Sequence, residues 1–174
     1  VVMYWKQFGS SGRVEHDKNQ LIIEQYLHCW DKFYDCGKSA FNTRFDAHAF
    51  SEKNVHELPA KIYFFSKKLL IPPINEFKKF VRFKCHRLGF LNTKEKFTIQ
   101  INHYGTKSYL EFFLSKRNRG GPTLVGEEGA RLLSAHAFEF VQRYCVSADY
   151  TIQRFLVHLK INMQKEIKNY YEQE

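Results

Sequence analysis

The spacing of the apolar residues changes twice along this chain, and each change limits the fold that the chain can adopt. Apolar residues from Ile22 to Tyr34 recur at three- and four-residue steps, which predicts a helix over residues 19–35. From Lys38 onward they alternate with polar residues, and this pattern of half-buried strands predicts a sheet region over residues 38–125. Helical spacing then returns twice and predicts helices over residues 127–145 and 149–173.

This order of elements predicts an α+β fold in a single domain over residues 1–174. We expect an antiparallel sheet from the middle of the chain, with the N-terminal and C-terminal helices packed on one face. Its strands include Lys61–Phe65, Phe97–Asn102 and Lys107–Leu114. A hydrophobic content of 44% argues against intrinsic disorder. No apolar run approaches the roughly 20 residues that span a bilayer, so we expect no membrane partner.

Residues 78–119, the basic window, carry the net charge of the whole protein. The window holds eleven lysines and arginines but only Glu95 and Glu111 as acidic residues, so its net charge is +9, equal to that of the full chain. Eight phenylalanines and tyrosines are interleaved with these cations. Because cations attract phosphates and flat rings stack on bases, the window predicts binding of single-stranded RNA or DNA.

Strand geometry indicates which side chains of the basic window face solvent. Alternate residues of a strand point to opposite sides, so Phe97, Ile99 and Ile101 are expected to face a helix while the polar residues that alternate with them face water. These polar residues are Lys96, Thr98, Gln100 and Asn102. With the solvent face of the next strand and the neighbouring basic segments, the predicted nucleic-acid-binding residues are Lys84, Arg87, Lys96, Lys107, Tyr109, Phe113, Lys116, Arg117 and Arg119.

One stretch of the chain resembles a known family. Residues 96–144 contain a strand, a turn, a second strand with Gly105, Tyr109 and Leu110, a short basic connection and a helix with an apolar stripe. This order is similar to one repeat of the PUR, PC4 and Whirly group of single-stranded nucleic-acid-binding domains. The resemblance implies a curved sheet that binds nucleic acid across its strand face. It also implies a second repeat, for which residues 38–80 are the candidate, or a dimer.

Two other functions stay open. The predicted helix 149–173 has an apolar stripe that either belongs to the core or forms a homo- or hetero-oligomer. In the second case the protein is a scaffold or assembly subunit, and the basic window is an ordinary solvated surface. A metal-dependent nuclease would bind the same polyanion, but the basic window supplies only two carboxylates to hold the metal.

No sequence motif assigns a catalytic residue, a metal site or a cofactor. The eight histidines and four cysteines lack zinc-ligand spacing, and neither a glycine-rich phosphate loop nor a nucleophile elbow is present. We therefore expect a binding protein without enzymatic activity. The cysteines, which are Cys29, Cys36, Cys85 and Cys145, are scattered among apolar residues, and we expect reduced, buried thiols in an intracellular protein.

Overall fold

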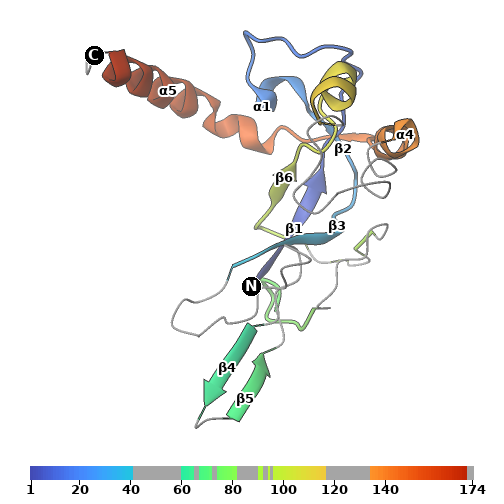
Figure 1. The fold of residues 1–174 in the computed structure, drawn as a ribbon, viewed down its shortest axis with the longest axis vertical. Helices are drawn as coiled ribbons and strands as arrows, with labels where there is room; N and C mark the ends of the chain where they lie inside the picture. Colours follow the sequence, from blue (N-terminus) through green and yellow to red (C-terminus); the bar gives the residue numbers. More distant parts are fainter. Residues whose placement is uncertain are drawn as a thin grey trace.

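The computed structural model describes residues 1–40, 60–64, 67–71, 74–81, 90–91, 94, 96–116 and 134–171. Within these ranges short strands and helices are mixed, which confirms the α+β class (Figure 1). The elements are β1 (Val2–Gln7), α1 (Ile22–Gln25), β2 (His28–Cys29), β3 (Tyr34–Ser39), β4 (Ala60–Phe64), β5 (Lys67–Ile71), β6 (Ile101–His103), η1 (Glu111–Lys116), α4 (Ala135–Arg143), β7 (Ser147–Ala148), η2 (Thr151–Phe155) and α5 (Leu156–Tyr171).

Strand β1 is the centre of a three-stranded sheet with the order β3-β1-β6. Its sequence, VMYWKQ, contains β-branched and aromatic residues that favour strands. It pairs antiparallel with β3 but parallel with β6, so this sheet is mixed rather than purely antiparallel as expected. A Cβ atom at Gly37 of β3 would lie 1.9 Å from the carbonyl oxygen of Met3, so the close approach of these strands requires glycine.

Two smaller antiparallel pairs complete the strand structure. Strands β4 and β5 form a hairpin in the register Ala60 to Ile71, at the lower end of the view in Figure 1. Strand β4 confirms the predicted strand over residues 61–64, and the last predicted residue, Phe65, lies outside the described residues. Strands β2 and β7 pair Cys29 with Ser147 and so connect the first 30 residues to the C-terminal region.

Aromatic side chains form the core around β1. Trp5, Phe8, Tyr26 and Trp30 are all buried. The Nε1 group of Trp30 donates a hydrogen bond to the carbonyl oxygen of Val141 in α4 at 2.9 Å. A polar partner of this kind offsets the cost of burying the indole N–H. The N-terminal strand and α4 are therefore held together by packing and by a buried hydrogen bond.

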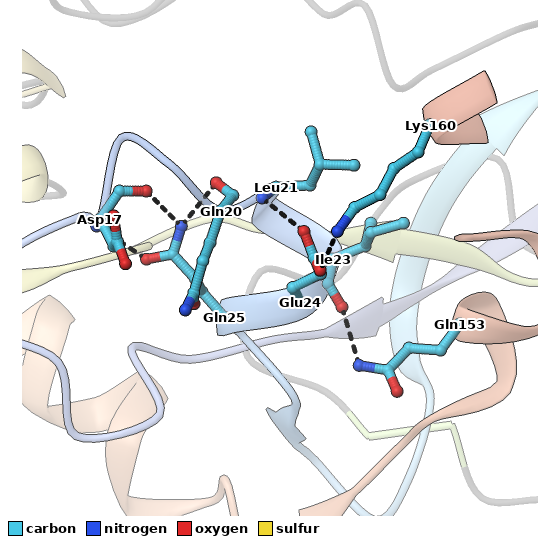
Figure 2. Close-up of polar contacts among 8 residues, drawn as sticks. All are labelled: Asp17, Gln20, Leu21, Ile23, Glu24, Gln25, Gln153 and Lys160. Carbon is cyan, nitrogen blue, oxygen red and sulfur yellow. Dashed lines mark hydrogen bonds and ion pairs between the residues drawn. The ribbon is translucent and has the colours of Figure 1, made fainter. Parts of the chain in front are cut away.

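The predicted helix over residues 19–35 is wrong for most of its length. Only Ile22–Gln25 is helical, and the chain then forms β2 and β3. Gln25 is buried, and its side chain bonds the backbone of Asp17 and Gln20 (Figure 2). Helical spacing is only a local preference, and here strand pairing with β7 and β1 outweighs it.

The predicted strand Lys107–Leu114 is also wrong, because the chain is helical from Tyr109 to Lys116 and continues through the wider π-helical segment η1. The Oγ atom of Ser108 accepts a hydrogen bond from the Glu111 N–H at 3.2 Å, as an N-cap does. Ser108 and Phe112, four residues apart, are buried, whereas Leu114 is 62% exposed. The buried residues thus follow a helical period and break the two-residue period of a strand.

Two C-terminal helices are present near the predicted positions. Helix α4 begins after Ser134, whose Oγ atom accepts a hydrogen bond from the Ala137 N–H. The second predicted helix is divided into η2 and α5. Every α5 residue from Val157 to Tyr170 is exposed, and Figure 1 shows α5 projecting away from the sheet, so α5 does not pack on the sheet face as expected. Among the described helices, none combines the length and apolar character that crossing a bilayer requires.

The cysteines differ in their oxidation state. Cys36 is disulfide-bonded, so the prediction of reduced thiols is wrong at this position. Cys29 and Cys145 are free, and burial raises their pKa values to about 11 and about 12, which keeps both thiols protonated and unreactive at neutral pH.

Candidate polyanion-binding groove

An open groove lies between three segments that are far apart in the sequence. Its volume is about 830 Å³. The segments are the turn after β2, the chain leading into β6, and η2 at the base of α5. The residues that line it are Asp31, Lys32, Phe33, Leu91, Lys96, Phe97, Thr98, Gln100, Asn102, Thr151, Ile152, Arg154 and Phe155.

Positive charge predominates along this groove. Lys32, Lys96 and Arg154 line it and are exposed, whereas Asp31 is the one acidic residue among the described residues of the lining. Lys6 adds a cation at the same end, since its Nζ atom lies 5.5 Å from the centroid of the Phe33 ring and 3.4 Å from the Asp31 carbonyl oxygen. The three segments therefore bring together cations that the sequence keeps apart.

The aromatic rings of the groove have two different roles. Phe97 packs against the rings of Tyr4 and Phe33, with centroid distances of 5.1 and 5.2 Å, and so anchors the groove to the core. Phe155 is 50% exposed at the opposite side, and the Arg154 guanidinium carbon lies 4.6 Å from its ring centroid. An exposed ring beside a guanidinium group is a surface on which a flat ligand can stack.

A hydrogen-bonded set of amides and a carboxylate orients the groove side chains next to β6. The Nε2 atom of Gln100 donates to Asn102 Oδ1 at 2.6 Å and to Asp149 Oδ2 at 3.0 Å. Asp149 Oδ1 accepts from the Thr151 N–H at 2.8 Å and thereby holds the start of η2. Burial opposes the charged form of Asp149, but the hydrogen bonds from Gln100 and Thr151 outweigh it, and the pKa of Asp149 is lower than usual.

Glu76 fixes the edge of the groove at residues 98–99. Its carboxylate accepts hydrogen bonds from the Thr98 N–H at 2.5 Å and the Ile99 N–H at 2.8 Å. The Thr98 hydroxyl lies 3.3 Å from both carboxylate oxygens. These contacts hold this part of the chain in place although it is not part of a strand.

The structure places the predicted nucleic-acid-binding residues in different surroundings. Lys96 lines the groove. Tyr109 and Phe113 lie instead on the helical segment 109–116, and Lys107, just before this segment, is ion-paired with Glu111. The side chain of Lys116 and the whole of Lys84, Arg87, Arg117 and Arg119 lie outside the described residues.

Tyr109 and Phe113 lie on a helix rather than on the face of a strand, and Tyr109 is 46% exposed whereas Phe113 is half-buried. They are four residues apart on a helix, and their ring centroids lie 4.5 Å apart. Both rings also contact Phe138 of α4, at 5.5 and 5.9 Å. Phe113 packs against the buried pair Phe112 and Phe138, so it contributes to the core rather than to an open surface.

A second, smaller pocket of about 380 Å³ adjoins this helical segment and is lined in part by Lys18, Lys107 and Glu111. Its positive charge is partly neutralised, because Lys107 and Glu111 are paired and Glu15 also lines it. We therefore regard the larger groove as the better candidate for a polyanion.

Sequence reasoning missed several groove residues but contained one correct signal. Lys32, Arg154 and Phe155 belong to segments outside the basic window, and nothing in their local sequence indicates that the fold brings them together. In contrast, Thr98, Gln100 and Asn102 line the groove, on the face that alternation assigned to solvent. The alternation holds at residues 96–98 but is wrong at Ile99, which was expected to face a helix and is 43% exposed. The reason is that the strand is confined to residues 101–103, so the two-residue period does not extend back to residue 99.

The described residues contain no group of three or more histidines, cysteines, aspartates and glutamates that could hold a metal ion. The described lining of the groove offers cations, amides, hydroxyl groups, aromatic rings and the carboxylate of Asp31. No family model, no curated protein and no solved structure matches this chain.

Proposed function

We propose that this chain binds single-stranded nucleic acid in the groove lined by Lys32, Lys96 and Arg154. One observation carries the proposal. The groove that these three exposed cations line is also lined by the exposed ring of Phe155 and by the amides of Gln100 and Asn102. Each of these groups suits one part of a nucleotide. The net charge of +9 on the chain supports the same polyanionic partner.

The cations suit the phosphates. Lys and Arg side chains that neutralise phosphates release condensed counterions, and this release makes the affinity depend strongly on salt. Lys32 and Lys96 act as mobile point charges, whereas the planar guanidinium of Arg154 can also bind a phosphate through two hydrogen bonds. Such contacts give affinity and position but read no base sequence.

The ring and the amides suit the bases. Stacking on one aromatic side chain contributes about 1–3 kcal/mol per base and tolerates any base. Gln100 and Asn102 offer amide groups that can donate to and accept from base edges. Because Gln100 is already held by Asp149, its orientation is set before a ligand arrives. A single strand suits this arrangement best, since its bases are free to unstack.

The proposal also includes other cations of the basic window, and the reason for including them is only their positive charge. Lys84, Arg87, Lys116, Arg117 and Arg119 would extend the positive surface for a longer strand. The resemblance to the PUR, PC4 and Whirly group supports the same class of ligand, although its second strand is replaced by a helical segment here.

The experiment is a titration of a mixed single-stranded oligonucleotide pool at two salt concentrations, with the products checked for cleavage. We expect binding that weakens steeply with salt, by a factor set by a slope of about −0.7 per phosphate contacted. The triple variant K32A/K96A/R154A should then lose at least about tenfold in affinity and show a shallower salt slope, since three phosphate contacts are removed.

The matched control is K18A/R143A/K165A, which removes the same number of lysines and arginines from exposed positions outside the groove. The control should bind nearly as the parent does. Equal losses in both triple variants would mean that overall charge, and not the groove, attracts the ligand. The absence of any salt-sensitive binding would overturn the proposal.

A second function, that of an assembly subunit, is favoured by one observation. The apolar stripe of α5 is exposed along its length instead of lying in the core. The third reading, a metal-dependent nuclease, has no such observation in its favour among the described residues.

A further inference from the structure

Two hydrogen bonds between described residues anchor the start of helix α5 to the body of the protein. Gln153, just before the helix, donates a hydrogen bond from Nε2 to the carbonyl oxygen of Ile23 at 3.4 Å. Lys160 donates to Glu24 Oε1 at 2.6 Å, and this hydrogen bond, followed by that from the Leu21 N–H, lowers the pKa of Glu24 (Figure 2). These contacts with α1 set the direction in which α5 leaves the body.

Beyond this anchor α5 presents an apolar stripe to solvent. Leu159, Met163 and Ile167 are 39%, 40% and 54% exposed, and Tyr170 is 64% exposed. Val157 and Ile161 are also exposed, at 67% and 44%, but they lie off this stripe. An apolar stripe aligned along one face of an exposed helix is typical of a helix that binds a partner.

The spacing of the stripe is the same in both directions from its midpoint. Leu159 and Ile167 lie four residues before and after Met163, and Leu156 and Tyr170 lie seven residues before and after it. Suppose that a second copy of the helix packs antiparallel, with its Met163 opposite Met163 of the first copy. Each apolar residue of the stripe then lies opposite an apolar residue of the other copy. Self-complementarity of this kind is what a twofold-symmetric interface requires.

We propose that two copies of this chain associate through α5, antiparallel and around a twofold axis at Met163. The charges agree with this arrangement. Lys165 and Lys168 lie on the side of the helix opposite to Met163, because two or five residues place a side chain more than 120° around the helix. Asn162 and Gln164 border the stripe without charge, and Lys160 is already engaged by Glu24.

A parallel pair is disfavoured by charge and by the position of the body. In a parallel pair identical residues face each other, so the two Glu166 carboxylates beside the stripe would come close together. The two bodies, which both lie at the start of α5, would also meet at the same end. In the antiparallel pair the bodies lie at opposite ends, where the projecting helix leaves room for them (Figure 1).

The length of the helix sets the strength of the expected dimer. Sixteen residues at about 1.5 Å each give about 24 Å of helix. A contact of this length between two helices falls near or below the lower limit of about 1,200 Å² for stable interfaces. We therefore expect a weak dimer that dissociates on dilution.

The experiment is light scattering of the full chain over a wide concentration range, compared with Met163→Glu and Lys165→Glu. The parent should move from monomer to dimer mass as its concentration rises. Met163→Glu places two carboxylates at the twofold axis and should stay monomeric, whereas Lys165→Glu should dimerise as the parent does. Because both positions are exposed, circular dichroism should show the same helix content in all three proteins.

Disulfide trapping then tests the orientation. In a mixture of Leu156→Cys and Tyr170→Cys proteins, the antiparallel pair should form crosslinks between the two variants. Crosslinks of each variant with itself alone would show a parallel pair and overturn the orientation. If the parent protein stays monomeric at every concentration, the proposed dimer is wrong. The apolar stripe of α5 would then bind a different protein. Nucleic-acid binding is measured separately, so either proposal can fail alone.

Discussion

The groove and the helical segment 109–116 both include residues of the basic window, but the fold gives them opposite characters. In the groove Lys96 meets Lys32 and Arg154 with one acidic residue in the described part of the lining, and Phe155 is half exposed. At the helical segment Glu111 is paired with Lys107, which lies just before the segment, and Phe113 packs on the core. The comparison teaches that basic charge in a sequence becomes a binding surface only where the fold gathers cations away from carboxylates.

The largest expected effect is a loss of folding stability when a core residue of the helical segment is truncated. Phe112→Ala should lower the free energy of unfolding by about 3–5 kcal/mol, because it leaves a cavity beside Phe138 and Phe113 in the core. Denaturant unfolding measures this loss. Leu114→Ala on the same segment is the control and should stay within about 0.5 kcal/mol of the parent, since Leu114 is exposed. Equal losses at both positions would contradict the helical packing described here.

The next effect concerns the two candidate stacking rings. Phe155→Ala should weaken binding of a single-stranded oligonucleotide by about tenfold, which corresponds to the loss of one stacked base at about 1.4 kcal/mol. Phe155→Tyr keeps a ring and should bind nearly as the parent does. Tyr109→Ala should leave the affinity unchanged, because that ring contacts Phe113 and Phe138. Fluorescence anisotropy compares all three, and a larger loss at Tyr109 would reverse the assignment.

A smaller effect is expected from Asp149, which supports the groove, and this effect depends on pH. The pKa of Asp149 in the folded protein is lower than the usual 3.8. The charged carboxylate therefore stabilises the folded state above pH 3.8. This stabilisation is lost as the pH falls through the lowered pKa. Asp149→Ala should lower stability by about 1 kcal/mol at neutral pH, because the start of η2 loses its cap. Melting temperatures of parent and variant should converge below about pH 4. If the difference in melting temperature stayed constant down to about pH 2, the charge of Asp149 would not contribute to the stability of the folded protein.

The smallest effect is expected at the ion pair on the helical segment. Both partners are partly exposed, so Lys107→Ala and Glu111→Ala should each change stability by no more than about 1 kcal/mol. A double-mutant cycle in low and high salt isolates the pair. A coupling well above this limit would mean that the pair holds the segment in place.

Part of this structure follows from the sequence, and the rest depends on distant contacts. The C-terminal helices follow from their own periodicity, strand β4 follows from its run of strand-forming residues, and the exposure of Lys96 and Thr98 follows from alternation. The segment 107–114 fits both a strand and a helix, and the choice between them depends on Ser108 as a cap for Glu111, which the S-x-x-E pattern indicates. Local sequence does not indicate that residues 31–33 and 151–155 meet residue 96, because the contact is made only when β2 pairs with β7 and β6 with β1.

The most direct test of the central claim is photocrosslinking of a single-stranded oligonucleotide that carries a photoreactive base, followed by mass spectrometry of the crosslinked peptides. Our account predicts crosslinks to peptides that contain residues 96–102 and Phe155. Crosslinks confined to the helical segment 109–116, with none in the groove, would contradict it.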